Sequence, residues 1–242
     1  MISRLETMDG LPIPQDPFAL RIVSAGQSYG LNTPFLDIWQ GNGLLISRMD
    51  GAVTLAGMPE EESMEETRLF LAACGGETVL CSRETAVCFP EFSIQTEGPV
   101  LVRQQPGETA PLPGEFPSPR MLYQVLSACQ SPSFPVPEFE PFYLDTSHRL
   151  RHGTAAAVVL EEAGEPAACA LALAVTDAAA LLTAVAVVPA FRRKGLGRQA
   201  VETLCCRLSG RKVFLFRAEE ENREFYEALG FLPEGNWVQG RL

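Results

Sequence analysis

The sequence of 242 residues predicts an α/β protein with a mixed, mostly antiparallel sheet flanked by helices, arranged as two α/β domains. Three observations support this class: strand and helix patterns alternate in both halves, a proline-rich stretch separates the halves, and the composition is that of a soluble globular chain. Hydrophobic residues make up 46% of the chain and charged residues 20%, which is enough apolar material for a real core. A β-meander followed by a βαβα run gives strands of mixed direction.

The proline-rich stretch marks the domain boundary. Residues 105–141 contain nine prolines, and proline at this density prevents regular strand pairing. We therefore expect a linker near residues 105–117, an N-terminal α/β domain over residues 1–110 and a second domain over residues 118–242. Apolar residues at helical spacing between Met121 and Cys129 predict a short helix that opens the second domain.

The second domain shows a regular succession of apolar and amphipathic segments. Ser209-Gly210 and Gly230 follow the two later helical patterns and predict where those helices end. The expected elements are a strand at 155–160, a turn at 161–166, an apolar strand on each side of Asp177, a helix at 196–208, a strand at 213–217 and a helix at 222–229.

The first domain carries a fainter copy of this order. Strands near 44–47 and 52–57 flank Asp50-Gly51, a good hairpin turn. Ser63 and Glu66 form a capping-box pattern that opens a helix, Gly75-Gly76 ends it, and a strand near 79–81 follows. Pro59 follows its strand as Pro189 does in the other half, which predicts a weak internal repeat. The alternative is two unrelated α/β domains, because hairpin–helix–strand order is common.

Charge and cysteine usage exclude several classes of function. The formal net charge is −11 and the pI is about 4.7, which argues against nucleic-acid binding through phosphate neutralisation. Seven cysteines lack a C-x-x-C spacing and only two histidines are present, so we expect reduced thiols, a cytoplasmic location and no metal site. The N-terminus has no apolar stretch typical of a signal peptide.

An apolar run at residues 167–188 has the length of a membrane span. Asp177 would then lie near the bilayer centre, where a carboxylate costs about 2.5–3.5 kcal/mol. Thr176-Asp177 is instead typical of a turn between two strands of ordinary length. We therefore expect a hairpin here and no membrane partner.

A local cationic cluster follows this run. The first N–H groups of a helix lack partners and its N-terminal dipole favours negative charge, and glycine allows a ligand to approach the backbone closely. This pattern predicts a pyrophosphate site where a strand passes into a helix. The cations are Arg192, Arg193, Lys194 and Arg198, and the glycines are Gly195 and Gly197.

The corresponding place in the first half has the opposite chemistry. After Pro59 the chain carries five carboxylates and no glycine, and these carboxylates repel a pyrophosphate. We therefore expect only the C-terminal half to bind a phosphate-bearing ligand. The carboxylates are Glu60, Glu61, Glu62, Glu65 and Glu66.

Residues 195–200 also match the dinucleotide fingerprint G-x-G-x-x-[GA], and Glu219 follows at the distance of a ribose-binding acid. Against this, residues 189–194 separate the strand from the first glycine, and too little chain remains for a nucleotide domain. A Walker loop is excluded because no G-K-[ST] follows. A helix start with solvated basic residues is the remaining alternative.

Two motifs in the second domain resemble the signatures of one enzyme family. The string R-R-K-G-L-G resembles the acyl-CoA signature [QR]-x-x-G-x-[GA] of the GNAT superfamily of N-acetyltransferases, carried by Arg192, Gly195 and Gly197. The string N-R-E-F-Y-E-A-L-G-F at residues 222–231 resembles the family's closing signature, N…Y-x-x-x-G-F. The resemblance covers about residues 118–242, and the N-terminal domain is then a degenerate GNAT-like repeat.

The resemblance implies an N-acetyltransferase that uses acetyl-CoA as co-substrate and needs no metal. The implied roles are a strand edge for the pantetheine arm, loop amides for the pyrophosphate, a residue that reaches the pantetheine or its sulfur, and a general acid for the departing thiolate, which is Tyr226. The implied co-substrate-binding residues are Val185, Ala186, Val187, Arg192, Arg193, Lys194, Gly195, Leu196, Gly197, Arg198 and Asn222.

The implied reaction is direct attack by a primary amine, of a small molecule or a peptide, on the thioester in a ternary complex. Some relatives carry a glutamate on the strand before the loop, but residues 181–188 have no carboxylate, so no base is assigned. The alternatives are a non-catalytic acyl-CoA-binding module and a dinucleotide binder. The segment DTSHRLRHG, with His148 and His152, favours neither a hydrolase nor a zinc site, and we expect a cleft border or a connection there.

Overall fold

The computed structural model describes the whole chain except residues 12, 113, 133 and 219–221. By its internal contacts the chain forms two compact units. Unit 1 comprises Met1–Val102, Leu215–Arg223 and Leu232–Leu242, and unit 2 comprises Arg103–Phe214 and Glu224–Phe231. The domain bounds that we expect, residues 1–110 and 118–242, stay a prediction.

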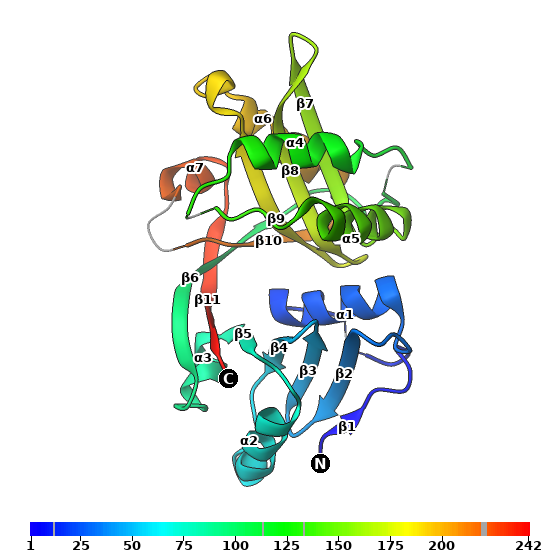
Figure 1. Ribbon diagram of the computed structural model, residues 1–242, viewed down its shortest axis with the longest axis vertical. Helices are drawn as coiled ribbons and strands as arrows, with labels where there is room; N and C mark the ends of the chain where they lie inside the picture. The colour runs from blue at the N-terminus through cyan, green and yellow to red at the C-terminus, as the bar shows by residue number, and fades with distance from the viewer. Residues whose placement is uncertain (12, 113, 133, 219–221) are drawn as a thin grey trace. The chain divides into compact units, whose positions relative to one another are not determined.

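Unit 1 is built on a mixed sheet with the strand order β1–β2–β3–β4–β5–β11–β6 (Figure 1). Among the described residues of this unit, β4 and β5 pair in parallel, and the pairs β1–β2, β2–β3, β3–β4, β5–β11 and β11–β6 are antiparallel. The strands are β1 (Ser3–Arg4), β2 (Leu36–Gly41), β3 (Leu44–Met49), β4 (Ala52–Gly57), β5 (Thr78–Ser82), β6 (Ser93–Gln104) and β11 (Leu232–Arg241). The helices are α1 (Pro17–Tyr29), the 3-10 helix η1 (Glu61–Ser63), α2 (Met64–Ala73) and α3 (Arg83–Val87).

Local sequence signals explain most of these boundaries. Asp16 caps α1, because its carboxylate accepts the amides of Phe18 and Ala19. Asp50 and Gly51 both have positive φ angles, of 48° and 80°, which two-residue hairpin turns require. The predicted β3–β4 hairpin, the α2 helix and the β5 strand are confirmed.

The capping box predicted at the start of α2 is wrong. Ser63 makes no side-chain hydrogen bond to the helix, since η1 leads into it and its backbone lies at φ −109° and ψ 12°, away from the extended conformation of a capping residue. Glu66 instead accepts the amide of Ile2 and lies 3.6 Å from the terminal ammonium of Met1. The carboxylate therefore fixes the N-terminal segment rather than the helix end.

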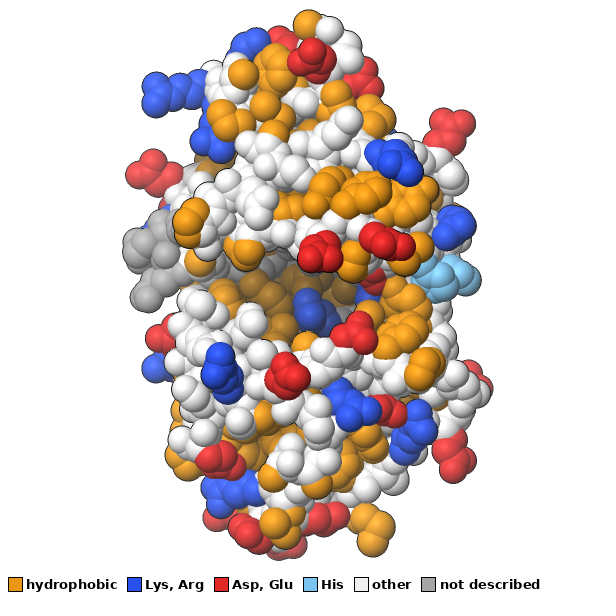
Figure 2. Space-filling model, in the orientation of Figure 1, with side chains coloured by type: hydrophobic (Ala, Val, Ile, Leu, Met, Phe, Trp, Pro, Cys, Tyr) orange, Lys and Arg blue, Asp and Glu red, His pale blue; other side chains and the backbone are white. Residues whose placement is uncertain are grey.

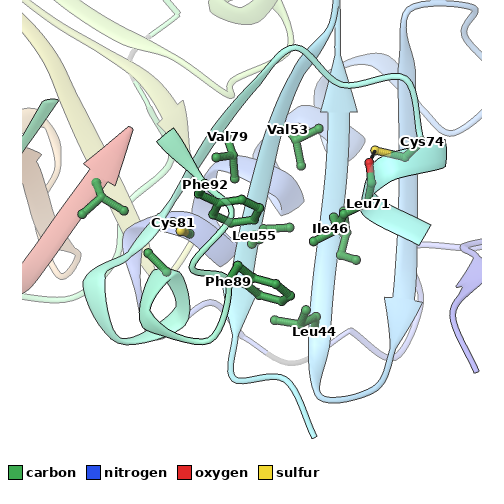
Figure 3. Close-up of a cluster of buried hydrophobic side chains, with 12 residues drawn as sticks. Leu44, Ile46, Val53, Leu55, Leu71, Cys74, Val79, Cys81, Phe89 and Phe92 are labelled. Carbon is green, nitrogen blue, oxygen red and sulfur yellow. Dashed lines mark hydrogen bonds between the residues drawn. The ribbon is translucent and has the colours of Figure 1, made fainter. Parts of the chain in front are cut away.

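The core of unit 1 fills the space beside β3 and β4 (Figure 3). Phe89 and Phe92 stack with ring centroids 4.9 Å apart and belong to the same buried cluster as Ile46 and Leu55. Helix α2 contributes Leu71 to this cluster. The residues that follow α3 thus close one face of the sheet.

Unit 2 has the strand order β10–β9–β8–β7. Figure 1 shows α4 and α5 in front of these strands. The strands are β7 (Ala156–Glu162), β8 (Glu165–Val175), β9 (Ala179–Val187) and β10 (Lys212–Phe216). The helices are α4 (Pro119–Ala128), α5 (Phe139–Arg151), the 3-10 helix η2 (Pro189–Phe191), α6 (Leu196–Arg207) and α7 (Arg223–Ala228).

Helices cover both faces of this sheet. Ala186 packs in the cluster that includes α4 and α5, whereas its neighbour Val187 packs against Leu196 of α6. Successive strand residues point to opposite faces, so α6 lies on the face away from α4 and α5. On the face in Figure 2, apolar side chains gather over α4 and α5, where the rings of Tyr123 and Phe139 meet at 5.0 Å.

The apolar run at 167–188 is the β8–β9 hairpin. Thr176 closes its turn by donating its amide to the carbonyl of Ala179 at 2.8 Å. Among the described residues, no helix combines the length and the apolar character that crossing a membrane requires. The hairpin prediction is confirmed.

The predicted linker and the polar segment DTSHRLRHG both belong to unit 2. The described residues of the linker predicted near 105–117 form no helix or strand, but they are tied to unit 2, because Gly210 donates to the carbonyl of Pro106 and Arg211 to that of Ala110. The segment DTSHRLRHG is not a connection: nearly all of it is the C-terminal half of α5. Pro141 and the dense charge conceal this helix in the sequence.

Candidate functional site

The end of β9 presents main-chain groups on its outer edge. Val187 lies opposite Ala168 of β8, and the amide of Val188 bonds to the carbonyl of Ala167 at 2.9 Å. Hydrogen-bonded and non-bonded pairs alternate in an antiparallel ladder. The N–H groups of Val185 and Val187 therefore point away from β8.

On that outer side lies β10, which is too short to cover the edge. The amide of Lys212, at the start of β10, bonds to the carbonyl of Ala178 just before β9 begins. β10 has 5 residues and β9 has 9, so β10 ends well before Val185. An extended chain with amide groups can pair with this free edge as an added strand does.

The loop that follows β9 presents a row of unpartnered amides. The chain makes one 3-10 turn at Pro189–Phe191 and then passes through left-handed conformations at Arg193 (φ 64°) and Gly195 (φ 80°) before α6 begins. Within the described chain, the amides of residues 193–198 donate to no protein acceptor. Such a row at a helix N-terminus binds an anion.

The two glycines of the loop serve different purposes. Gly195 holds φ 80° and a Cβ there would meet nothing within 4 Å, so its conformation is what requires glycine. Gly197 is an ordinary helical residue, but a Cβ there would lie 3.2 Å from Cγ2 of Val187 and 3.7 Å from the ring of Phe225. Gly197 thus lets β9, α6 and α7 pack together at the loop.

The cations of the loop are partly neutralised by the protein. Lys194 pairs with Glu162 of the β7–β8 hairpin at 3.0 Å, and Arg198 pairs with Glu202 at 2.9 Å. The Nε of Arg192 donates to the carbonyl of Val187 at 3.1 Å. Sequence reasoning missed both carboxylates. The i, i+4 spacing of Arg198 and Glu202 is readable from the sequence, whereas the partnership of Glu162 depends on the fold.

Arg193 differs from the other three cations. It is exposed and has no interaction with any described residue. Its positive φ angle is one that residues with a Cβ rarely adopt. An arginine in this conformation keeps its charge free for a ligand.

Tyr226 lies on α7, one residue from the Phe225 that contacts Gly197. Its ring packs edge-on against Phe225 at 5.0 Å and Phe231 at 5.8 Å, and its hydroxyl has no hydrogen-bond partner among the described residues. Burial raises the pKa of Tyr226 to about 12. The phenol is therefore protonated at neutral pH, as a proton donor must be.

The remaining predicted residues are less well placed. Asn222 has φ 54° and precedes α7, but by contacts it belongs to unit 1, so its role stays a prediction. Glu219, the ribose-binding acid of the dinucleotide alternative, lies outside the described residues. The described residues contain no group of three or more His, Cys, Asp and Glu that could hold a metal ion.

Unit 1 repeats this arrangement of elements in a closed form. β4, η1 and α2 follow one another as β9, η2 and α6 do, and β4 pairs with β5 only over Ala52–Thr54. The gap beyond is closed by the protein: Thr85 of α3 donates its hydroxyl to the carbonyl of Gly57 at 2.8 Å. Phe89 is 1% exposed. In the described part of unit 1, α3 and the residues after it thus cover the end of β4.

Sequence comparison identifies the family of unit 2. Residues 120–231 match the model of the acetyltransferase (GNAT) family. This part of the chain is a GNAT acetyltransferase domain. The match includes the glycine loop and α7, so the dinucleotide alternative no longer applies. No curated protein matches the chain in sequence.

Solved structures extend the likeness to the whole chain. A tandem GNAT protein from the clavulanic acid biosynthesis pathway shares 16% identity and a TM-score of 0.59, with 100% of this chain and 98% of that chain covered. A GCN5-related N-acetyltransferase from Kribbella flavida shares 20% identity and a TM-score of 0.58, with 92% and 95% covered. One from Sphaerobacter thermophilus shares 15% identity and a TM-score of 0.54, with 96% and 93% covered. At these identities the likeness shows the fold, and it confirms the expected pair of α/β domains.

Proposed function

We propose that the protein is an N-acyltransferase that moves an acetyl group from acetyl-CoA to a primary amine by direct attack in a ternary complex. The observation that carries this proposal is the row of unpartnered amides at residues 193–198, which continues the free edge of β9. Phosphate oxygens accept from such amides, and Arg193 adds an unpaired positive charge. The amide groups of a pantetheine arm match the strand edge at Val185–Val187.

The chain's own groups supply orientation and polarisation. Holding an amine and a thioester together lowers the barrier by converting an encounter into an intramolecular step. The outward N–H groups of β9 are the donors available to the thioester carbonyl as it gains negative charge. The amine nitrogen bonds to the acyl carbon, the C–S bond breaks, and the thiolate must receive a proton.

Tyr226 is our candidate for the proton donor. With the pKa of Tyr226 near 12, transfer to a thiolate of pKa about 8.5 is uphill by about 5 kcal/mol. This is well below the barrier of about 16 kcal/mol that corresponds to a typical enzyme turnover rate. The proton that the amine loses then returns to the phenolate of Tyr226 through solvent, which restores the acid.

Two measurements test the proposal. CoA and acetyl-CoA at millimolar concentration should raise the melting temperature, because a ligand specific to the folded state stabilises it. Tyr226→Phe should lower the turnover number by about 10²–10⁴-fold and leave the CoA dissociation constant within twofold. Unchanged melting with either ligand contradicts the proposal. If CoA binds but neither protein turns over, the function is acyl-CoA binding without catalysis.

The acceptor and the cellular location are also parts of this proposal. GNAT enzymes act on small-molecule or peptide acceptors, and we propose a primary amine of one of these two kinds. We also propose a cytoplasmic location, on the basis of seven free cysteines. A screen of amines for CoA release identifies the acceptor.

A further inference from the structure

Thr183 is the one polar side chain of β9, whose sequence is AALLTAVAV. It lies at an irregularity of the sheet: Leu182 pairs with Ala172 and Ala184 with Leu171, so Thr183 has no partner residue in β8. A bulge of this kind redirects a side chain and often lies beside an active site. The side chain of Thr183 is exposed in this otherwise apolar strand.

The hydroxyl of Thr183 is oriented by the sheet. Its Oγ1 donates to the carbonyl of Leu171 at 3.0 Å. The single hydroxyl proton is used in that bond, so the oxygen presents its lone pairs to the outside. A group that meets Thr183 must therefore be a hydrogen-bond donor.

The length of the co-substrate brings its reactive end to this residue. Thr183 lies four residues before Val187, which is about 13 Å along a strand. A pantetheine arm is comparable to an extended peptide of about four residues, or about 14 Å. An arm held by its phosphates at the loop and paired along the free edge of β9 thus ends near Thr183.

We propose that Thr183 orients the acceptor amine. This inference rests on the proposed acyl transfer. The neutral amine donates one N–H to Oγ1 of Thr183, which turns its lone pair toward the acyl carbon. Threonine accepts this hydrogen bond without taking the proton, which fits a strand that carries no carboxylate.

The test uses Thr183→Val, which keeps the β-branched shape and removes the hydroxyl. With hydroxylamine as a small nucleophilic probe, we expect kcat/KM for hydroxylamine to fall by about 10- to 100-fold, the range expected when one hydrogen bond in the transition state is lost. The KM for acetyl-CoA should stay within twofold. Thr183→Ser keeps the hydroxyl and should retain at least a third of the wild-type kcat/KM. Thr96→Val, at an exposed threonine of β6 in unit 1, is the matched control and should change neither constant.

Three outcomes overturn the inference. In the first, Thr183→Val keeps its kcat/KM for hydroxylamine within twofold. In the second, Thr183→Ser loses as much as Thr183→Val, which assigns the effect to packing. In the third, both variants lose acetyl-CoA affinity in parallel with rate. Absence of CoA binding or of hydroxamate formation by the wild-type protein is a different failure, because it refutes the proposed function and this role together.

Discussion

The segments β4–η1–α2 and β9–η2–α6 have the same order of elements and opposite chemistry. In unit 1, α3 follows β5 without an intervening residue, and the hydroxyl of Thr85 donates a hydrogen bond to the carbonyl of Gly57. In the other half, residues 217–222 separate β10 from α7 in the sequence, and no hydrogen bond from α7 to the end of β9 is seen among the described residues. The shared fold therefore does not by itself provide a binding site. The proposed site depends on whether the strand edge and the helix start stay open.

The net charges of the two units also differ, and unit 1 is the more negative. Unit 1 contains 8 Lys and Arg against 18 Asp and Glu, a net charge of −10, whereas unit 2 contains 11 against 12, a net charge of −1. Almost all of the chain's formal charge of −11 thus belongs to unit 1. These net charges favour the second unit over the first as the binding site of the proposed anionic co-substrate.

The largest effect is expected from a substitution in the core of unit 1, where the strand edge is closed. Phe89→Ala should lower the free energy of unfolding by about 3–5 kcal/mol, because it leaves a cavity in the core beside β4. It should not create a second CoA site, since the five glutamates after Pro59 remain. Denaturant unfolding and calorimetric titration with CoA measure both quantities, with Phe89→Leu as the conservative control. A second binding event in Phe89→Ala would show that packing alone keeps unit 1 empty.

The next effect concerns the open loop. Gly197→Glu should weaken CoA binding by more than about 100-fold, because it adds bulk between Val187 and Phe225 and a negative charge beside the phosphates. Glu65→Gly, in the corresponding part of unit 1, should leave the affinity unchanged. Titration calorimetry measures both, and melting of the unliganded proteins separates lost binding from lost folding. Equal affinities of wild type and Gly197→Glu would refute the assigned site.

A smaller effect is expected from the carboxylate that pairs with the loop. Glu162→Gln frees Lys194 to meet a phosphate, and CoA affinity should rise by about 2- to 5-fold, the range of one exposed ion pair. The gain should shrink as salt is added. Glu165→Gln is the control, because Glu165 lies at the same hairpin and forms no ion pair with a described residue. Weaker binding by Glu162→Gln would mean that the ion pair holds the loop in shape.

The smallest effect lies in the pH profile. Because burial raises the pKa of Tyr226 to about 12, the acid stays protonated through pH 10 and is lost only as the pH rises through its raised pKa. The turnover number should therefore stay constant between pH 8 and 10. An acid of ordinary pKa, about 10, would already be half ionised at pH 10. An alkaline limb centred near pH 10 that vanishes in Tyr226→Phe would contradict this shift.

Local signals predicted much of unit 2 and of the loop. The glycines, the basic residues and the apolar strand around Gly195 are contiguous, so one stretch of chain carries both the geometry and the chemistry. The capping-box pattern at Ser63 failed because η1 changes the backbone conformation before the helix begins. Helix α5 escaped detection because its apolar positions lie between a proline and several charges.

Contacts between distant residues were not predictable in the same way. The strand β11 has two glycines and no clean alternation, and it is defined by its pairing with β5 and β6. The closure of unit 1 joins Thr85 to Gly57, 28 residues apart, and the pairing of Lys194 joins it to Glu162, 32 residues apart. Neither pair leaves a pattern in the sequence, because each depends on where separate turns place the chain.

The central claim is that the amides at the start of α6 bind a diphosphate while their counterparts in unit 1 do not. Amide hydrogen exchange with and without CoA tests it directly. We predict slower exchange at residues 193–198 and along Val185–Val187 when CoA is present, with no change at residues 60–66. Unchanged exchange at residues 193–198, or protection at residues 60–66 instead, would contradict the account.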